Sequence, residues 1–485
     1  MTVSTTDPSE SVQSVLGSET DSEAAKAGRL RITWWMWTLT GALFFLYTSF
    51  SFRLHERLYT FGFDLGVFEQ AVRSYAHGHW PVSEVRGAGF PVLGDHFSPI
   101  LALVAPFYDL WPTPKTLMVV QAALIASSVL PLVLWTRRRL GDVAAAVIGG
   151  AYGLSWGVAS ALQVSFHEVA FAVPLITCSL ISLVEGRLRR AALWALPLIL
   201  VKEDLGMTAA VIGGFIIWRG SRKLGVITVL TGLVATIVAL LIVMPALNTD
   251  GGYNRAEWLM PPGGHGFGDV LYRYTVGVIT PEVKSTTLLL VLAPTLGLAM
   301  RSPLILIALP NLLGRFVANY DIGWGYGAHH SLVLMPIVFI AFVDALERRR
   351  SSRGSLNRYL MGCAAITLLI FPQFALWAVF QPATWKDDPH VAAAQRMMAL
   401  VPDNVTVQAT NTLVPHLSNR TSVSIFGWAQ SRPNPQWLVV DTAVPLFQRW
   451  PYDVATEAKV LEADRQAGYT AVGSDDGVVV LKRSN

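Results

Sequence analysis

Apolar runs separated by short polar segments fill most of the chain between residues 32 and 380. A membrane-spanning helix needs roughly 20 apolar residues, and fewer where protein surrounds it. The pattern predicts about eleven spans, give or take two. The candidate runs are 32–51, 116–136, 142–163, 169–184, 191–202, 205–218, 224–246, 286–300, 303–318, 331–346 and 358–380. We therefore predict a mainly α protein, a polytopic transmembrane helix bundle at residues 29–380.

Composition agrees with the membrane class. The 485 residues are 52% hydrophobic and only 14% charged, a balance that ordinary soluble domains do not show. Sixteen Trp and 13 Tyr are typical of a chain that meets the bilayer interface many times. The net charge of +4 forms no basic patch, so we expect no nucleic-acid partner. Cys178 and Cys363 fall in apolar runs, where cysteine is a small core residue.

Basic residues occupy every second connection between the predicted spans, and these connections are short. Such loops face the cytoplasm. Residues 1–28 are rich in Ser, Thr, Glu and Asp, which predicts a disordered cytoplasmic tail. With eleven spans in the cell membrane, the C-terminus then lies outside. The basic residues are Lys26, Arg29, Arg31, Arg137, Arg138, Arg139, Arg187, Arg189, Arg190, Arg219, Arg222, Lys223, Arg301, Arg348, Arg349, Arg350 and Arg353.

The opposite connections are longer and make up the outer side. Residues 52–115 form a first outer loop, and residues 247–285 form a second one with a turn-rich Pro261-Pro-Gly-Gly-His-Gly run. Within the first loop, Pro99–Leu110 is apolar but too short to span, which predicts a helix lying at the membrane interface.

From residue 381 the composition becomes that of a soluble protein. Periodicity predicts helices at 389–400 and 454–467, with strands near 404–410, 421–426, 436–441, 469–473 and 477–482. The last two strands are joined around Asp475-Asp476-Gly477, a turn sequence. Residues 381–485 are therefore predicted to form a small extracytoplasmic α/β domain.

Ionisable residues gather at the outer ends of the predicted spans. Charges bordered so closely by apolar residues usually have a functional reason. Simpler interpretations stay open: Asp64 could be the N-cap of a helix at 65–75, the charged turns could be solvated, and the two late histidines could be interfacial. The five groups are Asp64 with Glu69; Asp95 with His96; His167 with Glu168; Lys202, Glu203 and Asp204; and Asn319 to Asp321 with His329 and His330.

The motifs FDLGVFEQ, GDHFSP, FHEVAF, VKEDLG and the late HH pair carry a resemblance. Between Phe61 and His330 the chain resembles an uncharacterised family of bacterial and archaeal multi-pass membrane proteins, a numbered domain of unknown function grouped with the GT-C glycosyltransferases. The 381–485 region resembles that family more loosely. Asp95 departs from the pattern, because Asn is expected before the His-Phe-Ser-Pro run, which puts metal or ligand preference in doubt.

The GT-C resemblance implies a polyprenyl-phosphate sugar donor, an outward-facing site and a catalytic acid in the first outer loop, which Asp64 matches. A carboxylate there can deprotonate an acceptor hydroxyl, and the lipid phosphate needs a counter-charge. Some GT-C enzymes use no metal, so the use of Mn²⁺ or Zn²⁺ stays open. The residues expected to bind substrate or phosphate are Glu69, Asp95, His96, Lys202, His329 and His330, and the candidate metal ligands are His167, Glu168, Glu203 and Asp204.

The function that follows is sugar transfer from this donor to a cell-envelope glycan, lipid or protein. Two other classes remain. One is a transporter or flippase of lipid-linked sugars, although such proteins place polar residues near the bilayer midplane, often within internal repeats that are not seen here. The other is a non-catalytic cell-envelope assembly protein. Substitution of Asp64 separates the first class from the last.

Overall fold

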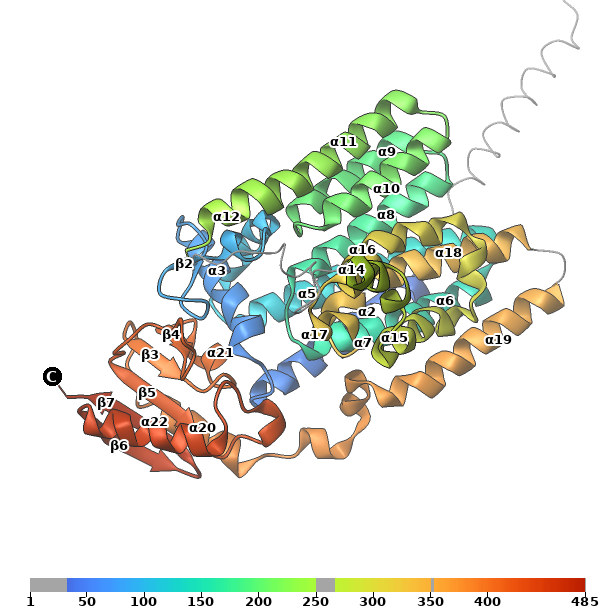
Figure 1. The fold of residues 1–485 in the computed structure, drawn as a ribbon. Coiled ribbons are helices and arrows are strands. Elements are labelled where there is room, and N and C mark those ends of the chain that lie inside the picture. Colours follow the sequence, from blue (N-terminus) through green and yellow to red (C-terminus); the bar gives the residue numbers. More distant parts are fainter. Residues whose placement is uncertain (1–32, 250–266, 350–352, 485) are drawn as a thin grey trace, which may run out of the picture.

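The computed structural model describes residues 33–249, 267–349 and 353–484. The predicted tail at 1–28 and the Pro261–Gly266 run lie outside these ranges. Within them the protein is mostly helical, a bundle with a small sheet domain at one end (Figure 1). The bundle helices are α2 Trp34–Glu56, α5 Pro114–Leu140, α6 Asp142–Gly153, α7 Trp156–Gln163, α8 Ala172–Val184, α9 Leu188–Ala195, α10 Leu205–Trp218, α11 Arg222–Val238, α12 Met244–Leu247, α14 Phe267–Tyr274, α15 Glu282–Leu292, α16 Leu309–Val317, α17 Asp321–Trp324, α18 Leu334–Arg348 and α19 Arg353–Ile370.

All the predicted spans fall largely on helical segments. The number of described helices that are long and apolar enough to cross a membrane is smaller. Five described segments are long and apolar enough to cross: Pro114–Leu140, Asp142–Gln163, Arg222–Leu247, His329–Arg348 and Gly354–Gln373. Shorter apolar helices are Pro99–Leu110, Glu168–Val184, Leu205–Trp218 and Pro303–Val317. The count of about eleven is therefore not confirmed.

The predicted span 286–300 is not a continuous helix. The α15 helix ends at Leu292 and a 3₁₀ turn covers Ala293–Thr295. Leu296 and Gly297 then take φ values of 50° and 70°, the left-handed conformation that ends helices. Pro294 lacks the N–H that an α-helix needs at this point. The apolar run was long enough for a span, but its Pro and Gly turn the chain.

The α10 and α11 helices form a hairpin whose backbones touch. A Cβ placed on Gly213 of α10 would lie 2.9 Å from the carbonyl oxygen of Gly225 on α11. Gly206 and Gly232 face each other one step further along in the same way. Small residues of this kind let membrane helices approach closely.

The sheet domain has five strands in the order β4-β3-β5-β7-β6. The first three are parallel, and β7 and β6 pair antiparallel, so the predicted sheet domain is confirmed. Asp476 and Gly477, with φ of 45° and 83°, make the tight turn between the last two strands. The strands are β3 Thr406–Ala409, β4 Ser422–Ile425, β5 Trp437–Asp441, β6 Tyr469–Asp475 and β7 Val478–Arg483, with helices α20 Pro389–Met398, α21 Val414–Leu417 and α22 Val454–Gln466.

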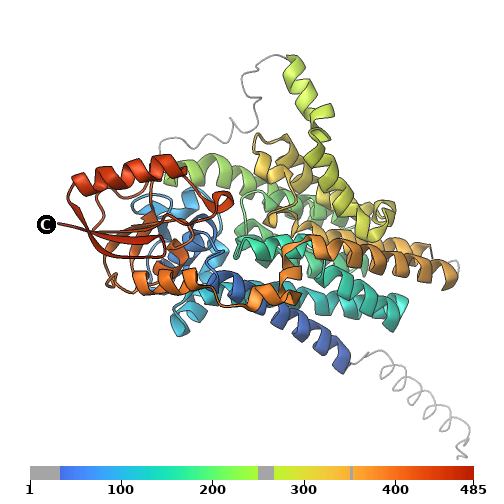
Figure 2. The same cartoon turned by 90° about the horizontal axis from the view of Figure 1, so that it is seen from below.

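The first outer loop lies between this sheet domain and the bundle, as both views show (Figures 1 and 2). Val67 and Ala71 of the loop share one buried cluster with Val414 and Val480 of the sheet domain. The loop contains a π-helical turn at Gly62–Gly66, α3 Val67–Ala76, the short β1 Val82–Ser83 and β2 Phe90–Pro91, a 3₁₀ turn Pro99–Val104 and α4 Ala105–Leu110. The sheet domain and the loop therefore fold around a common core.

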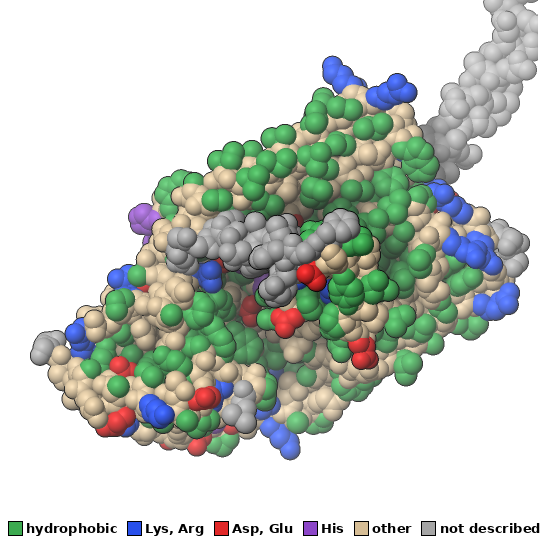
Figure 3. All heavy atoms as spheres, viewed as in Figure 1, with side chains coloured by type: hydrophobic (Ala, Val, Ile, Leu, Met, Phe, Trp, Pro, Cys, Tyr) green, Lys and Arg blue, Asp and Glu red, His purple; other side chains and the backbone are tan. Residues whose placement is uncertain are grey.

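The two ends of the bundle differ in charge. Lys and Arg side chains gather at the end away from the sheet domain, and hydrophobic side chains cover the helices between (Figure 3). Arg139 pairs with Glu347 there at 2.7 Å, which links two of the predicted cytoplasmic loops. This distribution agrees with the predicted alternation of loops, while the orientation of the termini stays a prediction.

Candidate functional site

Asp64 lies in the π-helical turn Gly62–Gly66, which leads directly into α3. Turns of this kind are frequent at functional sites. The Asp64 side chain is 28% exposed, so its carboxylate is accessible without being fully solvated. The residue before α3 is Gly66, and no side chain caps the helix. The N-cap interpretation of Asp64 is therefore wrong.

The sheet domain holds this turn in place. Gly62 N donates to both the backbone oxygen and the Oδ1 of Asn411, each at 2.9 Å. A Cβ on Gly62 would lie 2.8 Å from Cγ1 of Val414 in α21, and one on Gly66 would lie 3.1 Å from the same atom. Both glycines are needed because α21 packs directly on the turn. No pattern along the chain predicted that residues 411–414 reach the first outer loop.

Histidines extend from Asp64 as a stack. His167 Nε2 lies 3.4 Å from Asp64 Oδ1, and the His167 backbone N–H donates to Gln121 Oε1 at 2.9 Å. The His167 ring stacks on His329 at 3.5 Å between centroids, and His329 stacks on His330 at 4.3 Å. The structure thus brings together residues that the sequence predicted from three separate loops.

Glu168 and Lys202 form the next contact. Lys202 Nζ donates to Glu168 Oε1 at 2.7 Å, and Glu168 is fully buried. Glu203, the residue after Lys202, is also buried. A buried ion pair of this kind joins the His167 and Lys202 turns, so both predicted turns face inward and are not simple solvated hairpins.

Asp95 and His96 pair with each other and with an arginine. His96 Nδ1 lies 2.8 Å from Asp95 Oδ2, and the Arg86 guanidinium reaches both oxygens of Asp95, at 3.1 and 3.2 Å. Phe68 lies edge-on to both His96 and His167, at 6.1 and 5.4 Å between centroids. The Asp95–His96 pair therefore borders the histidine stack, although Arg86 engages the Asp95 carboxylate.

Glu69 is in a different environment. It is fully buried and accepts a hydrogen bond from the hydroxyl of Tyr108 in α4. Burial raises the pKa of this carboxyl. Among the described residues no hydrogen bond or ion pair joins Glu69 to Asp64 or to the histidines, so its position adds no support to its predicted role in substrate binding.

Two buried cations near the site were missed. Arg315 in α16 donates to Ser331 Oγ at 3.0 Å and to the Gly325 carbonyl at 3.1 Å, and Ser331 directly follows His330. Lys284 in α15 donates to the carbonyls of Gly277 and Phe316. Neither has a carboxylate partner among the described residues. Each is an ionisable residue inside an apolar helix, and that sequence signal could have identified both.

The predicted metal ligands do not fit a metal site. His167 Nε2 faces Asp64, and the Oε1 of Glu168 is taken by Lys202. Across residues 33–249, 267–349 and 353–484, no three His, Cys, Asp or Glu side chains are arranged to hold a metal ion. A metal would have to break the buried Glu168–Lys202 pair before it could use this carboxylate.

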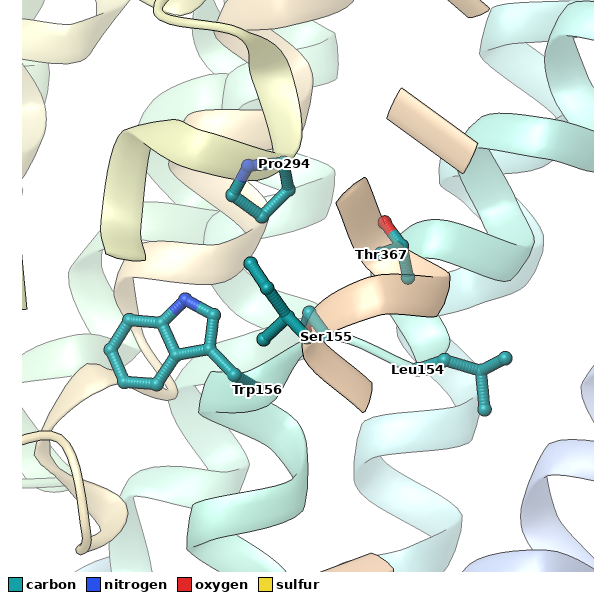
Figure 4. A pocket seen from close by; sticks show the side chains of 6 residues that line it. Leu154, Ser155, Trp156, Pro294 and Thr367 are labelled. Carbon is teal, nitrogen blue, oxygen red and sulfur yellow. The ribbon is translucent and has the colours of Figure 1, made fainter. Parts of the chain in front are cut away.

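Two cavities are also present, and their lining residues are far from Asp64 along the chain. Leu154, Ser155 and Trp156 line a space of about 10 Å³ with Pro294 and Thr367, which holds at most one water (Figure 4). The other is an open groove of about 490 Å³ lined by uncharged residues: Gln163, Tyr326, Gly327, Pro372, Gln373, Phe374, Ala375, Trp377, Ala378 and Gln381. Neither contains the ionisable residues of the site.

The comparisons with known proteins agree with this architecture. The chain resembles the crystal structure of ArnT from Cupriavidus metallidurans bound to undecaprenyl phosphate, with a TM-score of 0.53 and 14% identity over 93% of this chain and 98% of that one. The apo structure of the same protein gives a TM-score of 0.48 and 13% identity over 87% and 93%. At such identity the first likeness shows the fold alone.

No curated protein matches the chain. The model of one family does, and it covers residues 54–480, which include every residue of the site and the five-stranded sheet except the end of β7. Its description is "Predicted membrane protein (DUF2079)". Because the match extends over most of its length, the chain belongs to the DUF2079 family of membrane proteins.

Proposed function

We propose that this protein is a membrane glycosyltransferase that moves a sugar from a polyprenyl-phosphate donor to an acceptor outside the cytoplasm. The observation that carries the proposal is the partly open Asp64 carboxylate, fixed against His167 in a fold like that of the GT-C glycosyltransferases. ArnT, whose crystal structure with undecaprenyl phosphate has this fold, supports a lipid-linked donor.

Asp64 is the proposed general base. A base must reach the proton that it removes, and a carboxylate with 28% exposure can meet an acceptor hydroxyl from outside. The acceptor oxygen attacks the anomeric carbon as its proton passes to Asp64, and the bond between that carbon and the lipid phosphate oxygen breaks. His167, held at its backbone by Gln121, orients the carboxylate from the other side.

The cations of the site are the proposed counter-charge for the leaving lipid phosphate. Fixed positive charge in a water-poor site stabilises the charge that develops on a leaving group. Lys202 already shares its charge with Glu168 at 2.7 Å. Arg315, next to the His329–His330 turn, has only neutral hydrogen-bond partners among the described residues. We therefore place Arg315, with His330, closest to the leaving phosphate.

The test compares two substitutions at Asp64. Asp64→Asn keeps the size of the side chain but removes the proton acceptor, so transfer should fall by about 10²-fold or more while the protein stays folded. Asp64→Ala should be at least as inactive. Transfer of labelled sugar from a polyprenyl-phosphate donor is measured in membranes from cells that express each variant, since these membranes supply the native acceptor.

The matched control is Asp109→Asn, an exposed carboxylate in the same outer loop, which should leave transfer unchanged. Protein level and melting temperature are recorded for each variant. Near-normal transfer by a folded Asp64→Asn protein would remove Asp64 as the base. Loss of folding in both Asp64 variants would instead assign the residue a structural role.

A further inference from the structure

Three aromatic rings meet beside Asp64. Phe63, the residue before Asp64, lies edge-on to Trp428 at 5.2 Å and to Trp450 at 5.0 Å between centroids. The two tryptophans are 4.9 Å apart. Trp428 follows β4 and Trp450 precedes α22, so two loops of the sheet domain bring their rings to the catalytic turn. We call Phe63, Trp428 and Trp450 the aromatic cluster.

Close packing and hydrogen bonds fix the loop that carries Trp428. Gly427 has a φ of 84°, and the ring of Tyr452 lies so close that no side chain fits at position 427. The Ser431 N–H donates to the Trp428 carbonyl at 2.9 Å, and the Ser431 hydroxyl donates to the Ile425 carbonyl at 2.6 Å. A site built on fixed loops loses little conformational entropy when a ligand binds.

The cluster is open on one side. Trp450 is 39% exposed, and Phe447 on the same loop is 80% exposed. Charged side chains are also present here: Arg86 lies over Phe63 at 5.4 Å, and Arg432, four residues after Trp428, pairs with Glu84 at 2.8 Å. Exposed aromatic rings with a polar rim are unusual on a domain in water and mark a binding surface.

We propose that the aromatic cluster binds a pyranose ring of the acceptor, so that the protein transfers its sugar to a glycan or another glycosylated molecule. This inference rests on the proposed function and names the class of its acceptor. The C–H faces of a pyranose are apolar and stack on aromatic rings, while its hydroxyls, at the edge, meet donors and acceptors such as Arg86, Arg432 and Glu84.

The position of the cluster fits an acceptor better than a donor. The cluster belongs to the sheet domain and to the turn that carries the proposed base, whereas Arg315, proposed for the lipid phosphate, contacts Ser331 at the far end of the histidine stack that starts at His167. A sugar ring stacked on Phe63 and Trp450 would present its hydroxyl to the neighbouring carboxylate. The competing explanation for the exposed rings is insertion of Trp450 and Phe447 into the outer leaflet.

Fluorescence of the full-length protein in nanodiscs separates these explanations. The emission that depends on Trp450 is the difference between the wild type and Trp450→Phe. The probes are the neutral tetrasaccharides of glucose, mannose and N-acetylglucosamine at millimolar concentration, and nanodiscs made with brominated phosphatidylcholine. We expect at least one sugar to change the Trp450-dependent emission saturably and the brominated lipid to leave it unquenched. Quenching by the lipid, or no response to any sugar, would overturn the proposal.

A transfer assay adds an independent measurement. Trp450→Ala should raise the KM for the acceptor by about tenfold, the scale of one lost aromatic contact, with kcat little changed. Trp450→Phe should restore much of the affinity. Trp80→Ala, which removes another exposed tryptophan from the outer side, is the control and should have no effect. Sugar binding should persist in Asp64→Asn, so a failure of the proposed chemistry and a failure of the acceptor site give different results.

Discussion

Acid should destabilise the folded protein, because a neutral histidine is buried where the sheet domain meets the bundle. His416 of α21 stacks on His55 of α2, with 4.0 Å between ring centroids and nearly parallel planes. Burial, together with nearby Lys115, lowers the pKa of His416 from its ordinary value of 6.5 to about 4. The α21 helix also packs on the turn that carries Asp64, so the stack supports the site.

The sign and size of the effect follow from these two pKa values. Between pH 6.5 and about 4 the unfolded chain binds a proton at His416 that the folded protein does not, so stability is complete above pH 6.5 and falls as the pH is lowered. A difference of about 2.5 in pKa corresponds to a total loss of about 3 kcal/mol, at 1.36 kcal/mol per unit. By pH 5 roughly 2 kcal/mol of this should be lost.

The assay compares the wild type with His416→Phe, which keeps an aromatic ring against His55 but cannot be protonated. Free energies of unfolding are measured by denaturant titration in mixed micelles at pH 7.5 and pH 5. We expect the wild type to lose roughly 2 kcal/mol more than the variant over this range. His79→Gln, at an exposed histidine in the first outer loop, should behave like the wild type. Equal acid sensitivity in wild type and His416→Phe would refute the reasoning.

Two further predictions concern the support of the turn and the phosphate site. Asn411→Ala removes one of the two acceptors of Gly62 N–H at a cost of about 1 kcal/mol, so the turn that carries Asp64 is held less firmly. The variant should have a lower kcat, with a smaller change in the KM of either substrate. Asn419→Ala is the control, and an unchanged kcat in a folded Asn411→Ala protein would contradict the role. Arg315→Met should raise the KM for the polyprenyl-phosphate donor by about tenfold or more, and Arg315→Lys should raise it less. A normal donor KM in an Arg315→Met protein of normal melting temperature would show that Arg315 is not near the phosphate.

The sequence predicted the elements well where local patterns determine them. Apolar runs long enough for helices are helical, and alternation between residues 404 and 482 predicted each strand of the sheet domain. The prediction of 286–300 as one span was wrong, because apolar length outweighed the local effect of Pro294 and Gly297. A hydrophobicity pattern does not predict the backbone conformation of single residues.

Prediction of the site depended on a different kind of information. The topology predicted from the basic loops put Asp64, His167 and His330 on one membrane face. The structure brings them together because the loops converge at one end of the bundle. The contacts from Asn411 and Trp450 join residues more than 340 positions apart. Such pairings depend on how the sheet domain packs on the first outer loop, and no spacing along a single sequence encodes them.

The strand order of the sheet domain has a consequence for the timing of assembly. Strand β7 lies between β5 and β6 and not at an edge, so the sheet cannot close until residues 478–483 have left the ribosome. The Gly62–Gly66 turn in turn takes its shape from Asn411 and Val414 of that sheet domain. A chain that still lacks β7 therefore holds Asp64 in an unsupported loop, and the site is completed only after residues 478–483 have been added.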